Sequence, residues 1–164
     1  MSLRAFWFIT AAAATPLVAR AQQPRSVDVD VVRAVVEYYQ GARFKGPIVI
    51  DVGSETHRGP LVSSAVVDRV VQTTGSAKGA AADYLGCREE FSGGRKRQVC
   101  ETRRGAKAVV SLSDLVIRND TATVAVYYRK APTGRLEAVE EALTLVKGEG
   151  GRWTVVDRRE TGVS

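Results

Sequence analysis

The sequence predicts an α+β domain in which N-terminal helices pack on an antiparallel sheet of four to six strands. In the first half of the chain, apolar residues recur every three or four positions, which is typical of amphipathic helices. In the second half they alternate with polar residues between closely spaced turns, which indicates strands. Consecutive strands joined by short turns pair antiparallel, so helices that come earlier in the chain are expected to cover one face of the sheet.

Residues 1–21 have the features of a cleavable secretory signal peptide. Arg4 precedes an uncharged, mostly apolar run from Ala5 to Val18, and Ala19-Arg20-Ala21 offers the small residues that a signal peptidase recognises. The run is about 14 residues, short of the roughly 20 that a membrane-spanning helix needs. We therefore expect cleavage after Ala21 and an exported protein, periplasmic or secreted, with an uncleaved anchor as the alternative.

Residues 22–164 have the length of a single domain with one core. This part holds 22 basic and 18 acidic residues, a mildly basic balance. Much of the excess lies in Arg95-Lys96-Arg97 and Arg103-Arg104, and we interpret these as the solvated end of a hairpin. Nucleic-acid binding usually needs a denser basic stripe with interleaved aromatic residues, so no nucleic-acid partner is expected.

Two helices are predicted before residue 76. Ser26 is a candidate N-cap for the first, which carries a stripe of valines and Tyr39 and is expected to end at Gly41. Ser63 or Ser64 caps the second, which Gly75 ends. Residues 76–86 are ambiguous, with a short helical turn at 80–84.

The strands follow from runs of alternating or apolar residues between turns. A short apolar strand is expected at 48–52, and a ribbon at 87–103 precedes the main sheet. The four strands of that sheet are predicted at 108–118, 121–129, 136–147 and 152–159. Asn119-Asp120, Pro132-Thr133-Gly134 and residues 148–151 supply the turns between them.

Cys87 and Cys100 are the only cysteines, which in an exported domain predicts a disulfide. The bridge would close a loop of about 14 residues and stabilise the fold by on the order of 3 kcal/mol. Gly93-Gly94 lies between the two cysteines and suits a chain reversal. A lone pair of cysteines without a nearby histidine does not make a zinc site.

The terminal strands resemble the last hairpins of the nuclear transport factor 2-like superfamily, which includes ketosteroid-isomerase-like and polyketide-cyclase-like proteins. The likeness lies in residues 120–126, in 144–147 and in 150–157, which includes Gly151-Arg152-Trp153. It implies that the helices pack into a curved sheet to form a cone with an interior pocket. No local motif allows the catalytic residues of those enzymes to be assigned to this chain, so the resemblance concerns the fold alone.

Few residues are candidates for chemistry. Asp51, Glu55 and His57 are weak metal-ligand or acid-base candidates, since imidazole titrates near neutral pH and carboxylates can orient it, but an exposed loop histidine is the preferred interpretation. The weak pocket candidates are Tyr39, Tyr84, Glu141 and Trp153. Glu141 alternates with Val139 and Leu143, which indicates either a cavity or, as the preferred interpretation, a sheet edge.

Three functions remain open from the sequence. The leading hypothesis is non-enzymatic binding of a small apolar ligand or a protein partner through the concave face of the sheet. The alternatives are an acid-base enzyme of the isomerase or dehydratase kind and a structural interaction module of the cell envelope. No catalytic residue, cofactor or metal is predicted, nor stable membrane insertion after cleavage, and a homodimer remains open.

Overall fold

The computed structural model describes residues 25–53, 60–132 and 134–163, and these form an α+β fold. The helices are α1 (Ser26–Tyr38), which continues directly into a π-helix, η1 (Tyr39–Arg43), then α2 (Ser64–Thr74) and the single turn α3 (Ala81–Tyr84). The strands are β1 (Ile48–Asp51), β2 (Ala77–Gly79), β3 (Leu85–Ser92), β4 (Arg95–Thr102), β5 (Ala108–Arg118), β6 (Thr121–Lys130), β7 (Glu137–Lys147) and β8 (Trp153–Val163).

Six strands form the main sheet in the order β2-β1-β5-β6-β7-β8. From β5 to β8 each strand pairs antiparallel with the next, as the short turns between them predict. β1 pairs parallel with both β2 and β5, so the sheet is mixed at one end rather than wholly antiparallel. The register of β7 against β8 shifts at two places, near Glu141 and near Leu145.

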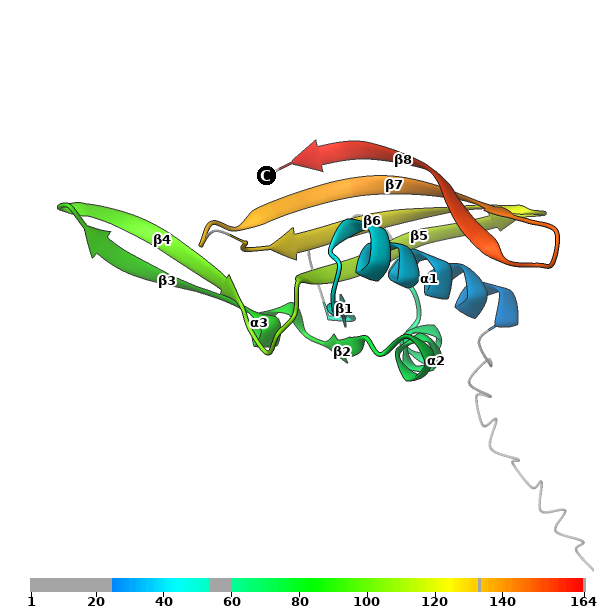
Figure 1. Ribbon diagram of the computed structural model, residues 1–164, viewed down its shortest axis with the longest axis horizontal. Coiled ribbons are helices and arrows are strands. Elements are labelled where there is room, and N and C mark those ends of the chain that lie inside the picture. Colours follow the sequence, from blue (N-terminus) through cyan, green and yellow to red (C-terminus); the bar gives the residue numbers. More distant parts are fainter. Residues whose placement is uncertain (1–24, 54–59, 133, 164) are drawn as a thin grey trace, which may run out of the picture.

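One face of the sheet and the helices enclose the core. α1 lies across β5 to β8, with α2 beside it (Figure 1). The valines of the predicted stripe are buried, and they meet the inward-facing residues of alternate positions on β5, β6 and β7. These inward residues are Val110, Leu112, Ala122, Val124, Val126, Tyr128, Leu143 and Leu145. The inner face of the sheet is therefore filled by helix side chains.

The ends of the second helix agree with the sequence prediction, whereas both ends of the first helix, the N-cap at Ser26 and the end at Gly41, were predicted wrongly. Ser63 caps α2 by accepting a hydrogen bond from the backbone N–H of Val66, and Gly75 ends it with φ +66°, as predicted. The first helix begins after Arg25, since Ser26 is already helical. It continues through Gly41 as η1 instead of ending there, because packing of Tyr39 into the core holds the extra turn.

The predicted ribbon is a separate two-stranded hairpin that extends away from the body of the protein (Figure 1). β3 and β4 pair over their whole lengths, and the chain reverses at Gly93-Gly94, where both glycines have positive φ. Cys87 and Cys100 are cross-strand neighbours and form the predicted disulfide, with Cα atoms 4.0 Å apart. We call residues 85–104 the arm.

Two backbone hydrogen bonds attach the base of the arm to the body. The N–H of Cys100 donates to the carbonyl of Gly134 at 2.6 Å, and the N–H of Arg103 donates to that of Tyr84 at 2.8 Å. The disulfide lies at this end of the hairpin, so the base is held and the outer half is not.

None of the helices in the described ranges is long and apolar enough to cross a membrane. The predicted signal peptide, residues 1–21, lies outside the described residues.

Candidate functional site

Asp51, a predicted metal-ligand candidate, ends β1 with its side chain buried. Its carboxylate accepts hydrogen bonds from the backbone N–H groups of Gly53 and Ala81, from the Ser111 hydroxyl, and from Arg129 at 3.0 Å. These four donors occupy both oxygens, and the ion pair with Arg129 compensates the buried charge. Asp51 therefore ties β1 to β5, β6 and α3, and has little capacity left to bind a metal.

The two other metal candidates, Glu55 and His57, lie outside the described residues. Among the residues that are described, no group of three or more His, Cys, Asp or Glu side chains could hold a metal ion.

Glu141 lies on the inner face of β7 and is 0% exposed. β7 is flanked by β6 and β8, so the preferred sequence interpretation, a sheet edge, is wrong. The hydroxyl of Tyr39, also 0% exposed, donates a hydrogen bond of 2.6 Å to Glu141 Oε2. Two of the four predicted pocket residues thus meet, although they are 102 positions apart in the chain.

Two arginines complete the cluster around Glu141. Arg158 on β8 donates to Glu141 Oε1 at 3.0 Å, and Arg43 of η1 lies 3.4 Å from the same oxygen. Arg43 also donates to the hydroxyl of Tyr128 at 2.8 Å. Both arginine side chains are about one third exposed, at 32% for Arg43 and 37% for Arg158. They therefore lie between the buried carboxylate and the solvent.

These contacts determine what the Glu141 cluster can do. Burial, and then the hydrogen bond to Glu141, raise the pKa of Tyr39, so its hydroxyl stays protonated at neutral pH. The Glu141 carboxylate accepts from one tyrosine and two arginines, so these donors occupy both of its oxygens. The arrangement is suited to joining η1, β7 and β8.

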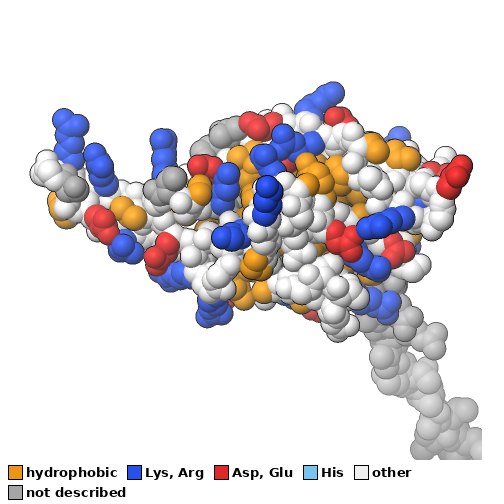
Figure 2. Space-filling view, in the orientation of Figure 1, with side chains coloured by type: hydrophobic (Ala, Val, Ile, Leu, Met, Phe, Trp, Pro, Cys, Tyr) orange, Lys and Arg blue, Asp and Glu red, His pale blue; other side chains and the backbone are white. Residues whose placement is uncertain are grey.

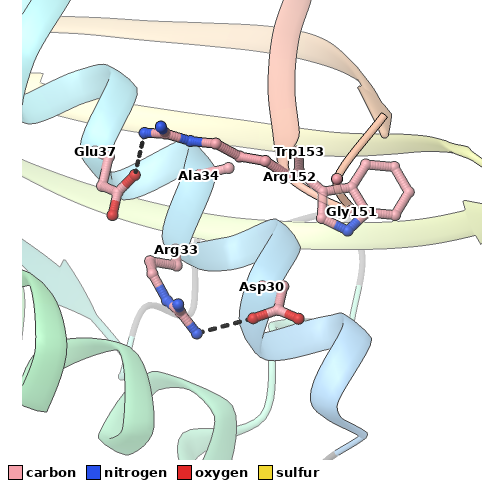
Figure 3. A pocket seen from close by; sticks show the side chains of 8 residues that line it. Asp30, Arg33, Ala34, Glu37, Gly151, Arg152 and Trp153 are labelled. Carbon is pink, nitrogen blue, oxygen red and sulfur yellow. Dashed lines mark hydrogen bonds and ion pairs between the residues drawn. The ribbon is translucent and has the colours of Figure 1, made fainter. Parts of the chain in front are cut away.

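Trp153, the third pocket candidate, is 4% exposed and forms part of a cleft between α1 and the start of β8 (Figure 3). The cleft has a volume of about 350 Å³. Arg152, at its rim, is 87% exposed and reaches Glu37 at 3.8 Å, and Arg33 pairs with Asp30 at 2.8 Å. Each cation in the cleft already has an acidic neighbour, so the cleft carries little net charge to attract a ligand.

Tyr84, the fourth pocket candidate, lies far from Glu141 in the fold, at the end of α3. Its half-buried ring packs on a small second core of Val49, Ala81, Ala106 and Val109, and the guanidinium of Arg104 lies 5.2 Å from the ring centre. Tyr84 thus contributes to the base of the arm rather than to a pocket with Tyr39, Glu141 or Trp153.

The arm is a candidate site that the sequence pattern alone does not single out. It contains six basic residues and three acidic ones, a net charge of +3, whereas residues 22–164 together carry +4. The remainder of that segment is thus nearly neutral. Figure 2 shows basic side chains along both edges of the arm, with acidic side chains among them on the lower edge. The sequence signal is present in Arg95-Lys96-Arg97, but only the structure places Arg95 and Lys96 on a projection beyond the body, with Arg97 lining a cleft against residues 134–136.

The chain matches no protein-family model, and no curated protein or solved structure matches it.

Proposed function

We propose that the protein is an exported, non-enzymatic interaction module that binds an anionic partner through the arm. The observation that carries the proposal is the concentration of positive charge on a hairpin that stands off the body. Long-range attraction to an anionic surface grows with net positive charge that projects into solvent, and the arm keeps a net charge of +3 after its three acids are counted. The disulfide and the two hydrogen bonds at the base present the arm in a fixed direction.

The inner face of the sheet is a poorer candidate for binding. Val32, Val36, Tyr39 and Leu143, which line it, are each at most 1% exposed. A ligand there would have to displace α1 from the core. We therefore favour the envelope interaction module over the leading sequence hypothesis, in which the concave sheet binds a small apolar ligand.

Export is part of the proposal. The disulfide between Cys87 and Cys100 favours a compartment outside the reducing cytoplasm. The predicted signal peptide at residues 1–21 agrees with a periplasmic or secreted location. We also retain as a proposal the cone-like arrangement of the nuclear transport factor 2-like superfamily, which the α+β order of elements supports at the level of fold class.

Site-specific photo-crosslinking in cells tests the proposal, because it captures a partner whose identity is not known in advance. A photoreactive amino acid replaces Phe91 near the tip of the arm, and in a matched control replaces Val156 on β8. Both positions are exposed apolar residues, at 79% and 58%. Adducts formed at position 91 in clear excess over position 156 are expected. Equal yields, or an excess at position 156, would refute binding through the arm.

An acid-base enzyme is the second candidate, favoured by the 2.6 Å contact between Tyr39 and Glu141. It requires substrate access to a carboxylate that is 0% exposed. Arg43 and Arg158 would have to swing away from Glu141 to admit a substrate, and this would leave the buried charge with only one partner. The cost of that step ranks the enzyme below the interaction module.

A further inference from the structure

We infer that the anionic partner is a lipid bilayer, onto which the tip of the arm docks with Phe91 inserted among the lipids. This inference rests on the proposed function, since it specifies what the arm binds. It concerns reversible attachment at the membrane surface, by a hairpin and not by a spanning helix.

The tip combines an exposed aromatic ring with three cations, of which Lys96 pairs with Glu89 and the other two form no ion pair in the described part of the chain. Phe91 is 79% exposed and is the second residue before Gly93, where the chain turns. Across the hairpin it pairs with Lys96. Arg95 and Arg97 are exposed and form no ion pair within the described part of the chain.

The positions of these residues surround the tip with positive charge. Successive residues of a strand point to opposite faces, so Lys96 shares a face with Phe91 while Arg95 and Arg97 lie on the other. Residues 91–97 include three cations and no acid; Glu90 lies opposite Arg97 across the hairpin, and Glu89 and Glu101 lie closer to the base of the arm.

The ion pairs of the arm leave the three cations of residues 91–97 available to bind an anionic partner. Lys96 pairs with Glu89 at 2.6 Å, but both side chains are more than half exposed, at 56% and 60%. Exposed pairs of this kind contribute little and exchange readily for other partners. Glu90, which lies opposite Arg97, pairs with Arg88 of its own strand at 2.8 Å, so Arg97 keeps its charge free for another partner.

A bilayer fits this tip better than a folded protein does. A specific protein interface usually buries about 800 Å² on each partner, whereas the tip of a two-stranded ribbon offers one aromatic ring and a few charged side chains. A bilayer requires no complementary shape. It takes up an aromatic side chain at the boundary of headgroups and acyl chains, while neighbouring cations contact lipid phosphates.

Each cation near an anionic bilayer raises partitioning by about fivefold, and burial of a phenylalanine side chain raises it by roughly tenfold or more. Three cations and one ring together support measurable, reversible attachment. The charge contribution falls with added salt, whereas the apolar contribution does not. The dependence of vesicle binding on salt therefore distinguishes the contribution of the cations from that of the phenylalanine ring.

The test measures co-sedimentation with phosphatidylcholine vesicles, with and without 30% phosphatidylglycerol (roughly one charge per three lipids, a strongly anionic surface). The protein is purified from the exported fraction as the cell processes it. We expect binding to the anionic vesicles only. Phe91→Ala should weaken it by roughly tenfold, and the double variant Arg95→Gln/Arg97→Gln by on the order of tenfold to thirtyfold.

Matched controls lie outside the arm. Val156→Ala removes an exposed apolar side chain on β8, and Arg69→Gln/Lys147→Gln removes two exposed cations from α2 and β7. Both control proteins should bind as the unaltered protein does. If they lose as much binding as the arm variants, attachment is general electrostatic adsorption and the inference fails.

Insertion of the ring has its own measurement. In Phe91→Trp, tryptophan emission should shift to shorter wavelength on anionic vesicles and be quenched by bromine-labelled acyl chains. Because Trp153 is buried, the unaltered protein provides the background signal. The absence of both changes would overturn insertion even where sedimentation is observed.

Two outcomes separate this inference from the proposed function. Binding to soluble heparin that depends on Arg95 and Arg97 but not on Phe91, with no vesicle binding, would keep the arm as an anion-binding element and refute the bilayer. Crosslinks from position 91 to a protein alone, again without vesicle binding, would do the same. Failure of the arm to crosslink at all would refute the proposed function as well.

Discussion

Replacement of Tyr39 by phenylalanine tests whether the Glu141 cluster stabilises the fold. The change removes one hydroxyl and leaves the ring against Phe44 and Tyr128, whose centres lie 5.6 and 5.9 Å from it. The lost hydrogen bond spans 2.6 Å between two side chains that are 0% exposed. A hydrogen bond to a charged group contributes about 1.5–3 kcal/mol, and Glu141 retains Arg158, so we expect a loss of about 2 kcal/mol.

A loss of about 2 kcal/mol corresponds to a Tm lower by roughly 6–8 °C for a domain of this size. Urea unfolding followed by circular dichroism at neutral pH measures the free energy, and calorimetry measures the Tm. Tyr38→Phe is the matched control, because Tyr38 is the neighbouring residue and is only half-buried. The free energy of unfolding should fall by no more than about 0.5 kcal/mol in this variant.

Glu141→Gln extends the test to the arginines. The change leaves Arg43 and Arg158 facing a neutral amide, for which we expect a loss of about 3 kcal/mol. This loss is at the low end of the range for breaking a buried ion pair, because both guanidinium groups are partly exposed to water. Should both variants unfold within about 0.5 kcal/mol of the unaltered protein, the cluster is not structural, and a reserved catalytic pair becomes the better explanation.

Four further predictions follow from other parts of the molecule. Burial and then the hydrogen bond to Glu141 raise the pKa of Tyr39 above its ordinary value near 10, so above pH 10 the folded protein keeps a proton that the unfolded chain loses. The free energy of unfolding should therefore fall by about 1.4 kcal/mol per pH unit above pH 10. Comparison with Tyr39→Phe at each pH isolates this slope. Replacement of Cys87 and Cys100 by serine should speed hydrogen exchange in the arm while β5 to β8 stay protected, and reaction of both thiols with an alkylating reagent in native, unreduced protein would contradict the disulfide. Asp51→Asn should cost about 2–3 kcal/mol in chemical unfolding because Arg129 loses its carboxylate, and an unchanged midpoint would show that Asp51 does not bind β1 to the sheet. N-terminal sequencing of exported protein should begin at Gln22, whereas an intact Met1 in membrane fractions would mean an anchor.

The strands of the main sheet could be predicted closely from the sequence. The predicted bounds of β5 are the observed ones, and one end each of β6 and β7 differs by one residue from the prediction, whereas β8 ends four residues later than predicted. Alternation also requires that only one of Tyr127 and Tyr128 face the core, and it is Tyr128, which is 1% exposed while Tyr127 is not buried. These elements follow from local patterns, because one face of each strand is buried and the other faces solvent.

Elements held by distant contacts could not be predicted. β2 has three residues, Ala77–Gly79, without a β-branched side chain, and it is a strand because it pairs with β1. No feature of the sequence predicts that the helix continues through Gly41 as η1, because the glycine itself indicates a helix end. Both depend on what lies beside them in the folded protein.

The candidate site was predictable only in part. Glu141 alternates with Val139 and Leu143 along β7, which is consistent with a side chain on the core face of the sheet. Its hydrogen-bond partners are distant in sequence, and no local motif connects them. Asp51 ends a strand that is buried throughout. A carboxylate at the end of an apolar strand indicates a buried charge that needs a partner, and this is the sequence feature from which its ion pair could have been predicted. The arm was predictable as a ribbon, whereas its projection from the body depends on the tertiary structure.

The two ends of the main sheet affect how the protein behaves among its own copies. A long, flat outer strand is a template on which a second chain can add by backbone hydrogen bonding, the first step of fibre formation. β2 offers only three residues for such addition. β8 is long, but its two register shifts distort the strand, and Asp157, Arg158, Arg159 and Glu160 place a run of charge along it. Neither end of the main sheet therefore favours addition of a second chain, although β8 exposes a strand of eleven residues.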